Sequence, residues 1–155
     1  MASDRSAHIV TATAQLKAEP RRVYDTIANY HTGHPRILPS QFSDLTVEKG
    51  GIGEGTVIRF DLRVLGRTDT FRAVVSEPEP GRVLVEKNIL GNDGVSTFIV
   101  EPAADGREST VTIQTRISGR SGFAGRIESW LITRVLQPLY HEELRKLEAV
   151  AQAGG

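Results

Sequence analysis

Residues 123–151, FAGRIESWLITRVLQPLYHEELRKLEAVA, form the stretch that decides the fold. Its large apolar residues follow one another at spacings of mostly three and four, which predicts one amphipathic helix. At 1.5 Å per residue this helix is about 43 Å long, whereas a globule of this size has a radius of gyration of about 15 Å. One helix can therefore cross the whole molecule. Pro138 lies inside it and should kink it, because proline cannot donate to the carbonyl of Arg134.

The chain before this helix is dominated by short segments in which apolar and polar residues alternate. Ile9 to Leu16 predicts a first strand, and Pro20 opens a short helix over about 20–30, with a further helical turn near 36–38. Six more strands are predicted near residues 42–47, 57–65, 70–76, 82–89, 96–100 and 111–117. The pattern does not assign an inner face to the strand at 82–89. Short turns between the strands predict an antiparallel meander.

A sheet with one apolar face needs a cover, and the helix at 123–151 is the only long element that can supply it. We therefore predict the α+β class, with a curved antiparallel sheet of about seven strands wrapped around that helix. Aromatic residues make up only 6% of the chain, so few large side chains are available to fill the concave side. This shortage favours a cavity between helix and sheet, and a completely filled core is the alternative.

Composition excludes several classes of function. The chain has 155 residues, which indicates one domain over 1–155 with a core of about 8–151. Lys+Arg and Asp+Glu are both 19, so the formal charge is +0, which argues against a nucleic-acid partner and against a polybasic membrane protein. Without cysteine there are no disulfides or thiolate metal sites. No apolar run approaches the ~20 residues of a membrane span, so we expect no stable membrane insertion and a cytoplasmic location.

The order strand, two short helices, six-strand meander and long C-terminal helix resembles the helix-grip fold of the START-like superfamily, also called SRPBCC. Three stretches carry the resemblance, which covers about residues 8–151: residues 18–28, AEPRRVYDTIA, are similar to the opening of the first helix, 51–56, GIGEGT, to a glycine-rich connection, and 136–147, LQPLYHEELRKL, to the last helix. The superfamily includes birch-pollen-allergen-like proteins and the polyketide cyclase/dehydrase branch. These motifs specify the fold and leave catalytic residues unassigned.

The resemblance implies a pocket floored by the middle of the long helix. The expected partner is a small hydrophobic molecule (a lipid, isoprenoid or polyketide) that the protein carries or senses as a monomer or homodimer, without a cofactor. The alternatives are a polyketide cyclase or aromatase that uses the same pocket for aldol closure and dehydration, and a protein-interaction module. The expected ligand-contacting residues are Ile27, Tyr30, His34, Ile58, Phe60, Leu62, Phe71, Phe98, Trp130, Leu131 and Arg134.

Two further motifs have competing interpretations. His31 and His34 could ligate a metal, but no third ligand is adjacent, so we predict no metal site and leave open a polar contact to the ligand or plain loop histidines. Arg59, Asp61 and Arg63 alternate with the apolar face of their strand. We expect them to be solvated or paired across strands, and the alternative is a charged pocket.

Overall fold

The computed structural model describes residues 6–154, and its elements follow the predicted order. The sequence of elements is β1 (Ser6–Leu16), α1 (Pro20–Ala28), α2 (His34–Ile37), β2 (Phe42–Lys49), β3 (Val57–Val64), β4 (Arg67–Glu79), β5 (Val83–Asn88), β6 (Val95–Ala103), the 3-10 turn η1 (Ala104–Gly106), β7 (Glu108–Gly119) and α3 (Gly122–Ala153).

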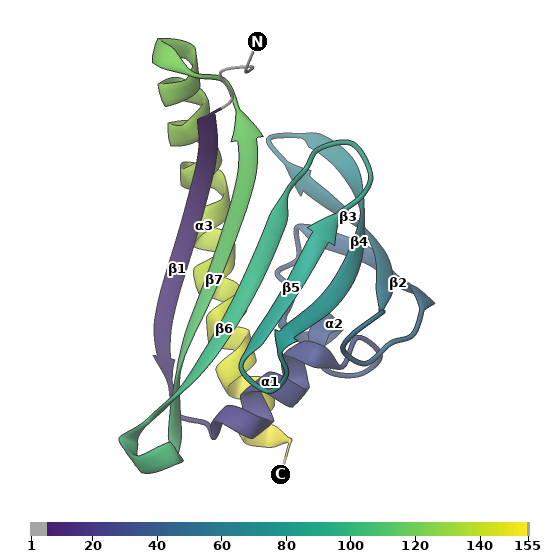
Figure 1. Ribbon diagram of the computed structural model, residues 1–155, viewed down its shortest axis with the longest axis vertical. Helices are drawn as coiled ribbons and strands as arrows, with labels where there is room; N and C mark the ends of the chain where they lie inside the picture. Colours follow the sequence, from purple (N-terminus) through teal and green to yellow (C-terminus); the bar gives the residue numbers. More distant parts are fainter. Residues whose placement is uncertain (1–5, 155) are drawn as a thin grey trace.

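The strands form one antiparallel seven-stranded sheet in the order β1-β7-β6-β5-β4-β3-β2. Consecutive strands from β2 to β7 are neighbours, as a meander requires, and β1 adds to the far edge beside β7. The sheet curves around α3, and α1 and α2 close one end (Figure 1). The predicted fold class, with its seven strands, long helix and two short helices, is confirmed.

Helix α3 lies along the concave side of the sheet and continues through Pro138. Its C-terminal half packs into the core through Tyr140, Leu144 and Leu147, which form one buried cluster with residues of α1 and of the sheet. Its N-terminal half has an outward face of exposed apolar residues, whose best example is Phe123, with 79% of its surface exposed. The two halves of the helix therefore have different environments.

The glycine-rich connection between β2 and β3 holds α1 close to the sheet. The Gly51 carbonyl accepts from the Tyr30 amide at 2.8 Å, and the Gly53 amide donates to the Ala28 carbonyl at 2.9 Å. Gly51 has a φ of 138°, and a Cβ there would lie 1.8 Å from Nε2 of His31. Glycine is needed at this position because the backbone angle is strained for other residues and the space is occupied.

The inner face of β5 is polar, which explains why the sequence pattern did not assign it. Leu84 and Asn88 are buried, Glu86 lies between them on the same face, and the outward Lys87 is exposed. A strand that turns Leu, Glu and Asn to the core does not show the usual alternation of apolar inside and polar outside. This departure from the pattern lies at the site described next.

Candidate functional site

A cavity of about 140 Å³ lies between the sheet and α3. It resembles in size an apolar cavity of about 150 Å³ that accepts one benzene-sized ring. Strands β2 to β7, the start of α2 and the middle of α3 all contribute to its wall. The lining residues are His34, Leu38, Phe42, Leu45, Ile58, Phe60, Leu62, Phe71, Ala73, Glu86, Asn88, Asn92, Gly94, Ser96, Phe98, Ile113, Thr115, Ile117, Leu136, Tyr140 and Glu143.

One side of the cavity is an aromatic wall built on three neighbouring strands. The rings of Phe60 and Phe71, which are register partners on β3 and β4, stack with centroids 5.4 Å apart. Phe42 on β2 adds a tilted ring 5.8 Å from Phe60. Offset stacks of this kind are favourable ring arrangements, and their flat faces suit an unsaturated ligand.

The opposite side carries a buried carboxyl group, that of Glu143 on α3. Its side chain is 3% exposed and lines the cavity. Across residues 6–154, no hydrogen-bond or ion-pair partner meets this carboxyl, which faces the open space of the cavity. Burial, and secondarily the negative charge of Glu86, raises the pKa of Glu143 well above its usual value. Its surroundings therefore favour the neutral form of the Glu143 carboxyl, which can donate one hydrogen bond into the cavity.

Glu86 is held in place by two side chains from the segment around α2. Tyr30 donates from its hydroxyl to Oε1 of Glu86 at 2.5 Å, and Nε2 of His34 lies 3.5 Å from the same oxygen. The His34 ring stacks on Tyr30 at 4.4 Å, and its Nδ1 lies 2.9 Å from the Ile27 carbonyl oxygen. Burial and then the charge of Glu86 raise the pKa of Tyr30 well above its usual value. The phenol therefore remains a hydrogen-bond donor to Glu86 at any ordinary pH.

Hydroxyl groups form the third polar feature of the cavity. The Tyr140 hydroxyl on α3 hydrogen-bonds with the Thr115 hydroxyl on β7, which in turn lies 2.7 Å from the Ser96 hydroxyl on β6. Burial raises the pKa of Tyr140 to about 12. These three hydroxyls connect the helix to the sheet, so they fix the separation between the two walls.

The β5–β6 loop closes one end of the cavity and is organised by Asn88. The Asn88 side-chain amide donates to the carbonyls of Leu90 and Asn92, at 2.9 and 3.1 Å, and its oxygen accepts from the Arg72 amide at 3.2 Å.

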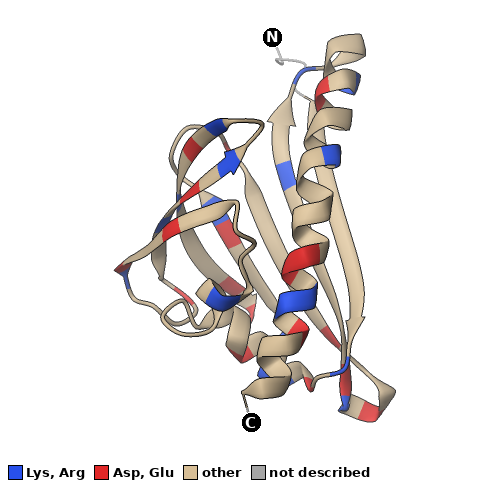
Figure 2. Cartoon of the chain, turned by 180° about the vertical axis from the view of Figure 1, so that it is seen from behind, with Lys and Arg blue, Asp and Glu red and all other residues tan. Residues whose placement is uncertain are grey.

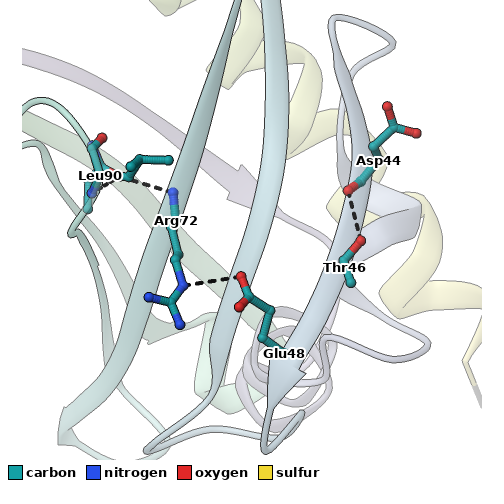
Figure 3. A network of polar contacts seen from close by, with 6 residues as sticks. Asp44, Thr46, Glu48, Arg72 and Leu90 are labelled. Carbon is teal, nitrogen blue, oxygen red and sulfur yellow. Dashed lines mark hydrogen bonds and ion pairs between the residues drawn. The ribbon is translucent and has the colours of Figure 1, made fainter.

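On the outer face of the sheet the Arg72 guanidinium reaches Glu48 on β2 at 3.2 Å (Figure 3). Figure 3 also shows the β2 bulge, where the Thr46 hydroxyl donates to the carbonyl of Asp44.

The charged residues of β3 lie away from the cavity. Arg59 and Arg63 are exposed, and Asp61 accepts a hydrogen bond from Thr70 on β4 at 2.7 Å. None of the three lines the cavity. The expectation that they are solvated or paired across strands therefore describes their positions better than the charged-pocket alternative.

The structure places most of the expected ligand-contacting residues at the cavity, but moves those of α3 away from it. The lining includes His34, Ile58, Phe60, Leu62, Phe71 and Phe98. Ile27 and Tyr30 are fully buried behind this lining. Trp130, Leu131 and Arg134 are exposed outside the cavity, where the Arg134 guanidinium lies 5.3 Å from the centre of the Trp130 ring. The floor of the cavity lies further along the helix, at Leu136, Tyr140 and Glu143.

Sequence reasoning missed the two carboxylates of the cavity, Glu86 and Glu143. A signal for Glu143 was present, because spacings of three and four place it on one helix face with Tyr140 and Leu147, which are both buried. The run HEELRK around it looks like a solvated surface, which hid this signal. Glu86 had no such signal, since it occupies a strand whose inner face is itself polar.

The described residues provide neither a metal-binding cluster nor a membrane-spanning helix. In residues 6–154, no group of three or more His, Asp or Glu side chains is arranged to hold a metal ion. No helix in the same range is long and apolar enough to cross a membrane.

Comparison with known proteins supports the fold and the family. Residues 7–152 match the family model described as polyketide cyclase / dehydrase and lipid transport. The solution structure of the KanY protein has 28% sequence identity and a TM-score of 0.78, and the match covers 97% of this chain and 99% of that one. No curated protein matches the chain.

Two more distant structures share the fold. The Zhui aromatase/cyclase from a Streptomyces species, strain R1128, is 15% identical with a TM-score of 0.75, over 95% of this chain and 94% of that one. A START superfamily protein from Mycobacterium smegmatis is 14% identical with a TM-score of 0.72, and the match covers 94% of this chain and 99% of that one. Since the family model spans nearly the whole chain, the protein belongs to the polyketide cyclase / dehydrase and lipid transport family.

Proposed function

We propose that the protein binds a small, uncharged, largely unsaturated molecule with a carbonyl or hydroxyl oxygen at one end. The observation that carries the proposal is the buried acid of Glu143, which lines an aromatic cavity and has no partner within residues 6–154. A buried polar group without a hydrogen bond costs free energy. A ligand oxygen that accepts from Glu143 removes that cost and gives the ligand one orientation.

The charges of the lining argue against an anionic ligand. Within the described chain no lysine or arginine lines the cavity, whereas Glu86 and Glu143 both do. A carboxylate or phosphate placed there would lose its hydration and face acidic groups without a cationic partner. The proposed ligand is therefore neutral, which narrows the expected lipid, isoprenoid or polyketide to members with a carbonyl or hydroxyl end.

A matched set of probes of nearly equal shape tests the proposal. We expect para-ethylacetophenone to bind more tightly than the apolar para-ethylcumene, and para-ethylbenzoate to show no binding at pH 8. One neutral hydrogen bond corresponds to about fivefold in affinity. In Glu143→Leu the preference for the ketone over the hydrocarbon should vanish, whereas Glu143→Gln, which keeps a donor, should retain it. Equal affinities of the ketone and the hydrocarbon for the unmodified protein, measured by calorimetry, would contradict the proposal.

A second candidate is catalysis of aldol closure and dehydration, and a specific observation favours it. The same cavity holds a neutral acid, Glu143, and a second carboxyl, Glu86, that Tyr30 and His34 orient. Ring closure of a poly-β-ketone needs one group that takes a proton beside a carbonyl and another that gives a proton to the carbonyl oxygen. Under this hypothesis Glu86→Gln stops aromatic product formation from a linear poly-β-ketone thioester while ketone affinity stays within threefold of the starting value.

A further inference from the structure

Most of the exposed large apolar side chains in residues 6–154 gather at one end of the molecule. The N-terminal half of α3 exposes four of them, Phe123, Ile127, Trp130 and Leu131, and 60% of the surface of Trp130 is exposed. At 100° per residue these four positions fall within an arc of about 100°, so they form one stripe along the helix. We call them the α3 stripe. It faces away from the sheet, because the core contacts of the helix come from its other side.

Two loop tips carry further apolar residues to the same end. Leu65, at the β3–β4 turn, is 82% exposed, and Ile89 and Leu90 in the β5–β6 loop are also exposed. The strand register places the β5–β6 loop beside the start of α3, since Lys87 pairs with Val95 and Val95 with Arg116 near the end of β7. Figure 1 shows both loops at the end where α3 begins. We call this end, formed by residues 63–69, 87–95 and 116–134, the apolar end.

The apolar end is also positively charged, although the chain as a whole is neutral. Its three segments contain seven lysines and arginines and three acidic residues, an excess of four positive charges in a chain whose total is +0. Figure 2 shows the blue positions on the N-terminal half of α3 and on the neighbouring hairpin. Arg120 and Arg126 line a hollow of about 470 Å³ together with Phe123. Cations therefore lie directly beside the α3 stripe.

We infer that the apolar end docks on an anionic lipid bilayer, with the α3 stripe in the interfacial layer. The stripe exposes on the order of 450 Å² of side chain, about half of what one partner contributes to a stable dimer. Its neighbours Leu65 and Leu90 project from separate loops, which a broad lipid surface can accommodate together. Tryptophan and arginine beside an apolar stripe are typical of helices that lie in a membrane interface. This inference does not rest on the proposed ligand.

Trp130 is the only tryptophan in the chain, so its fluorescence reports on the stripe directly. With vesicles of phosphatidylcholine and phosphatidylglycerol at low salt, we expect a blue shift of the emission and co-sedimentation of the protein. Vesicles of phosphatidylcholine alone should bind weakly, and added salt should release the protein, because charge attraction is screened.

Paired variants locate the docking surface without touching the cavity. Phe123→Ser with Ile127→Ser should lower the partition coefficient at least tenfold, and Arg120→Gln with Arg126→Gln should lower it about fivefold per arginine. Ile52→Ser is the control, because Ile52 is exposed on the β2–β3 connection at the other end of the sheet. All of the substituted side chains are exposed, so we expect every variant to fold. Circular dichroism of each variant checks this.

Three results would overturn the inference. One is unchanged fluorescence and no co-sedimentation with the anionic vesicles at low salt. Another is a loss of binding in Ile52→Ser equal to that in the double serine variant. The third is a Trp130 blue shift with an acidic carrier protein, or on formation of a dimer at high protein concentration, but not with vesicles. The last result would assign the apolar end to a protein partner.

Discussion

Replacing Glu143 by glutamine should make the protein more stable at neutral pH and change how its stability depends on pH. The folded state raises the pKa of Glu143 well above its usual 4.5. Above about pH 4.5 the unfolded chain releases this proton while the folded protein keeps it. The unfolded state then binds fewer protons, so the free energy of unfolding falls as pH rises, until pH passes the pKa of the folded state.

The magnitude follows from one proton. In that window Glu143 lowers the free energy of unfolding by about 1.4 kcal/mol per pH unit. Glutamine has nearly the same shape as the neutral acid and does not titrate. The free energy of unfolding of Glu143→Gln should therefore exceed that of the wild type by a further amount of about 1.4 kcal/mol for each pH unit above about pH 5. Urea unfolding at several pH values between about 4 and 8 measures the difference directly.

Glu142→Gln is the matched control on the same helix. Glu142 is half-buried beside Lys146, with Oε1 and Nζ 3.9 Å apart, and does not line the cavity. Its replacement should shift stability by less than about 1 kcal/mol at every pH. A difference between wild type and Glu143→Gln that stays constant from pH 4 to 8 would refute the reasoning, because Glu143 would then titrate as it does in the unfolded chain.

Three further substitutions test other parts of the structure. Tyr30→Phe removes the donor to Glu86 and should lower the free energy of unfolding by about 1.5–3 kcal/mol in chemical denaturation. Gly51→Ala should cost about 1–3 kcal/mol because φ is 138° there, and adding His31→Ala should restore only the part due to the clash. Trp130→Ala should change stability by no more than about 0.5 kcal/mol and leave ketone affinity unchanged in calorimetry, since Trp130 is exposed outside the cavity.

The sequence predicted the fold well because each element follows a simple pattern. The period of two over residues 57–65 comes from Ile58 and Leu62, which are buried on one face of β3, and the meander follows from short turns such as the one at 91–94. The spacing of three and four predicted α3 within two residues at each end. Patterns of this kind arise from burial, and burial determines the fold.

The site was harder to predict because it departs from those patterns. β5 turns Glu86 and Asn88 inward, and α3 buries Glu143 within a run of charged residues. Trp130 was expected at the cavity because the fold that the sequence resembles has a pocket floored by the middle of the long helix, where Trp130 lies. The N-terminal half of α3 instead presents Trp130 and Phe123 to the outside. Which face of a helix meets the sheet depends on its packing angle, which residue spacing alone does not determine when both faces are apolar.

Infrared difference spectroscopy of the Glu143 carboxyl tests the central claim most directly. In unmodified protein at pH 7 we predict the carbonyl stretch of a protonated carboxylic acid, which should be absent from Glu143→Gln. Adding para-ethylacetophenone should move this band to lower frequency as the acid donates to the ketone, and para-ethylcumene should leave it in place. A spectrum without the protonated band at pH 7, or a band that the ketone does not move although it binds, would contradict the claim that Glu143 is a neutral donor to the ligand.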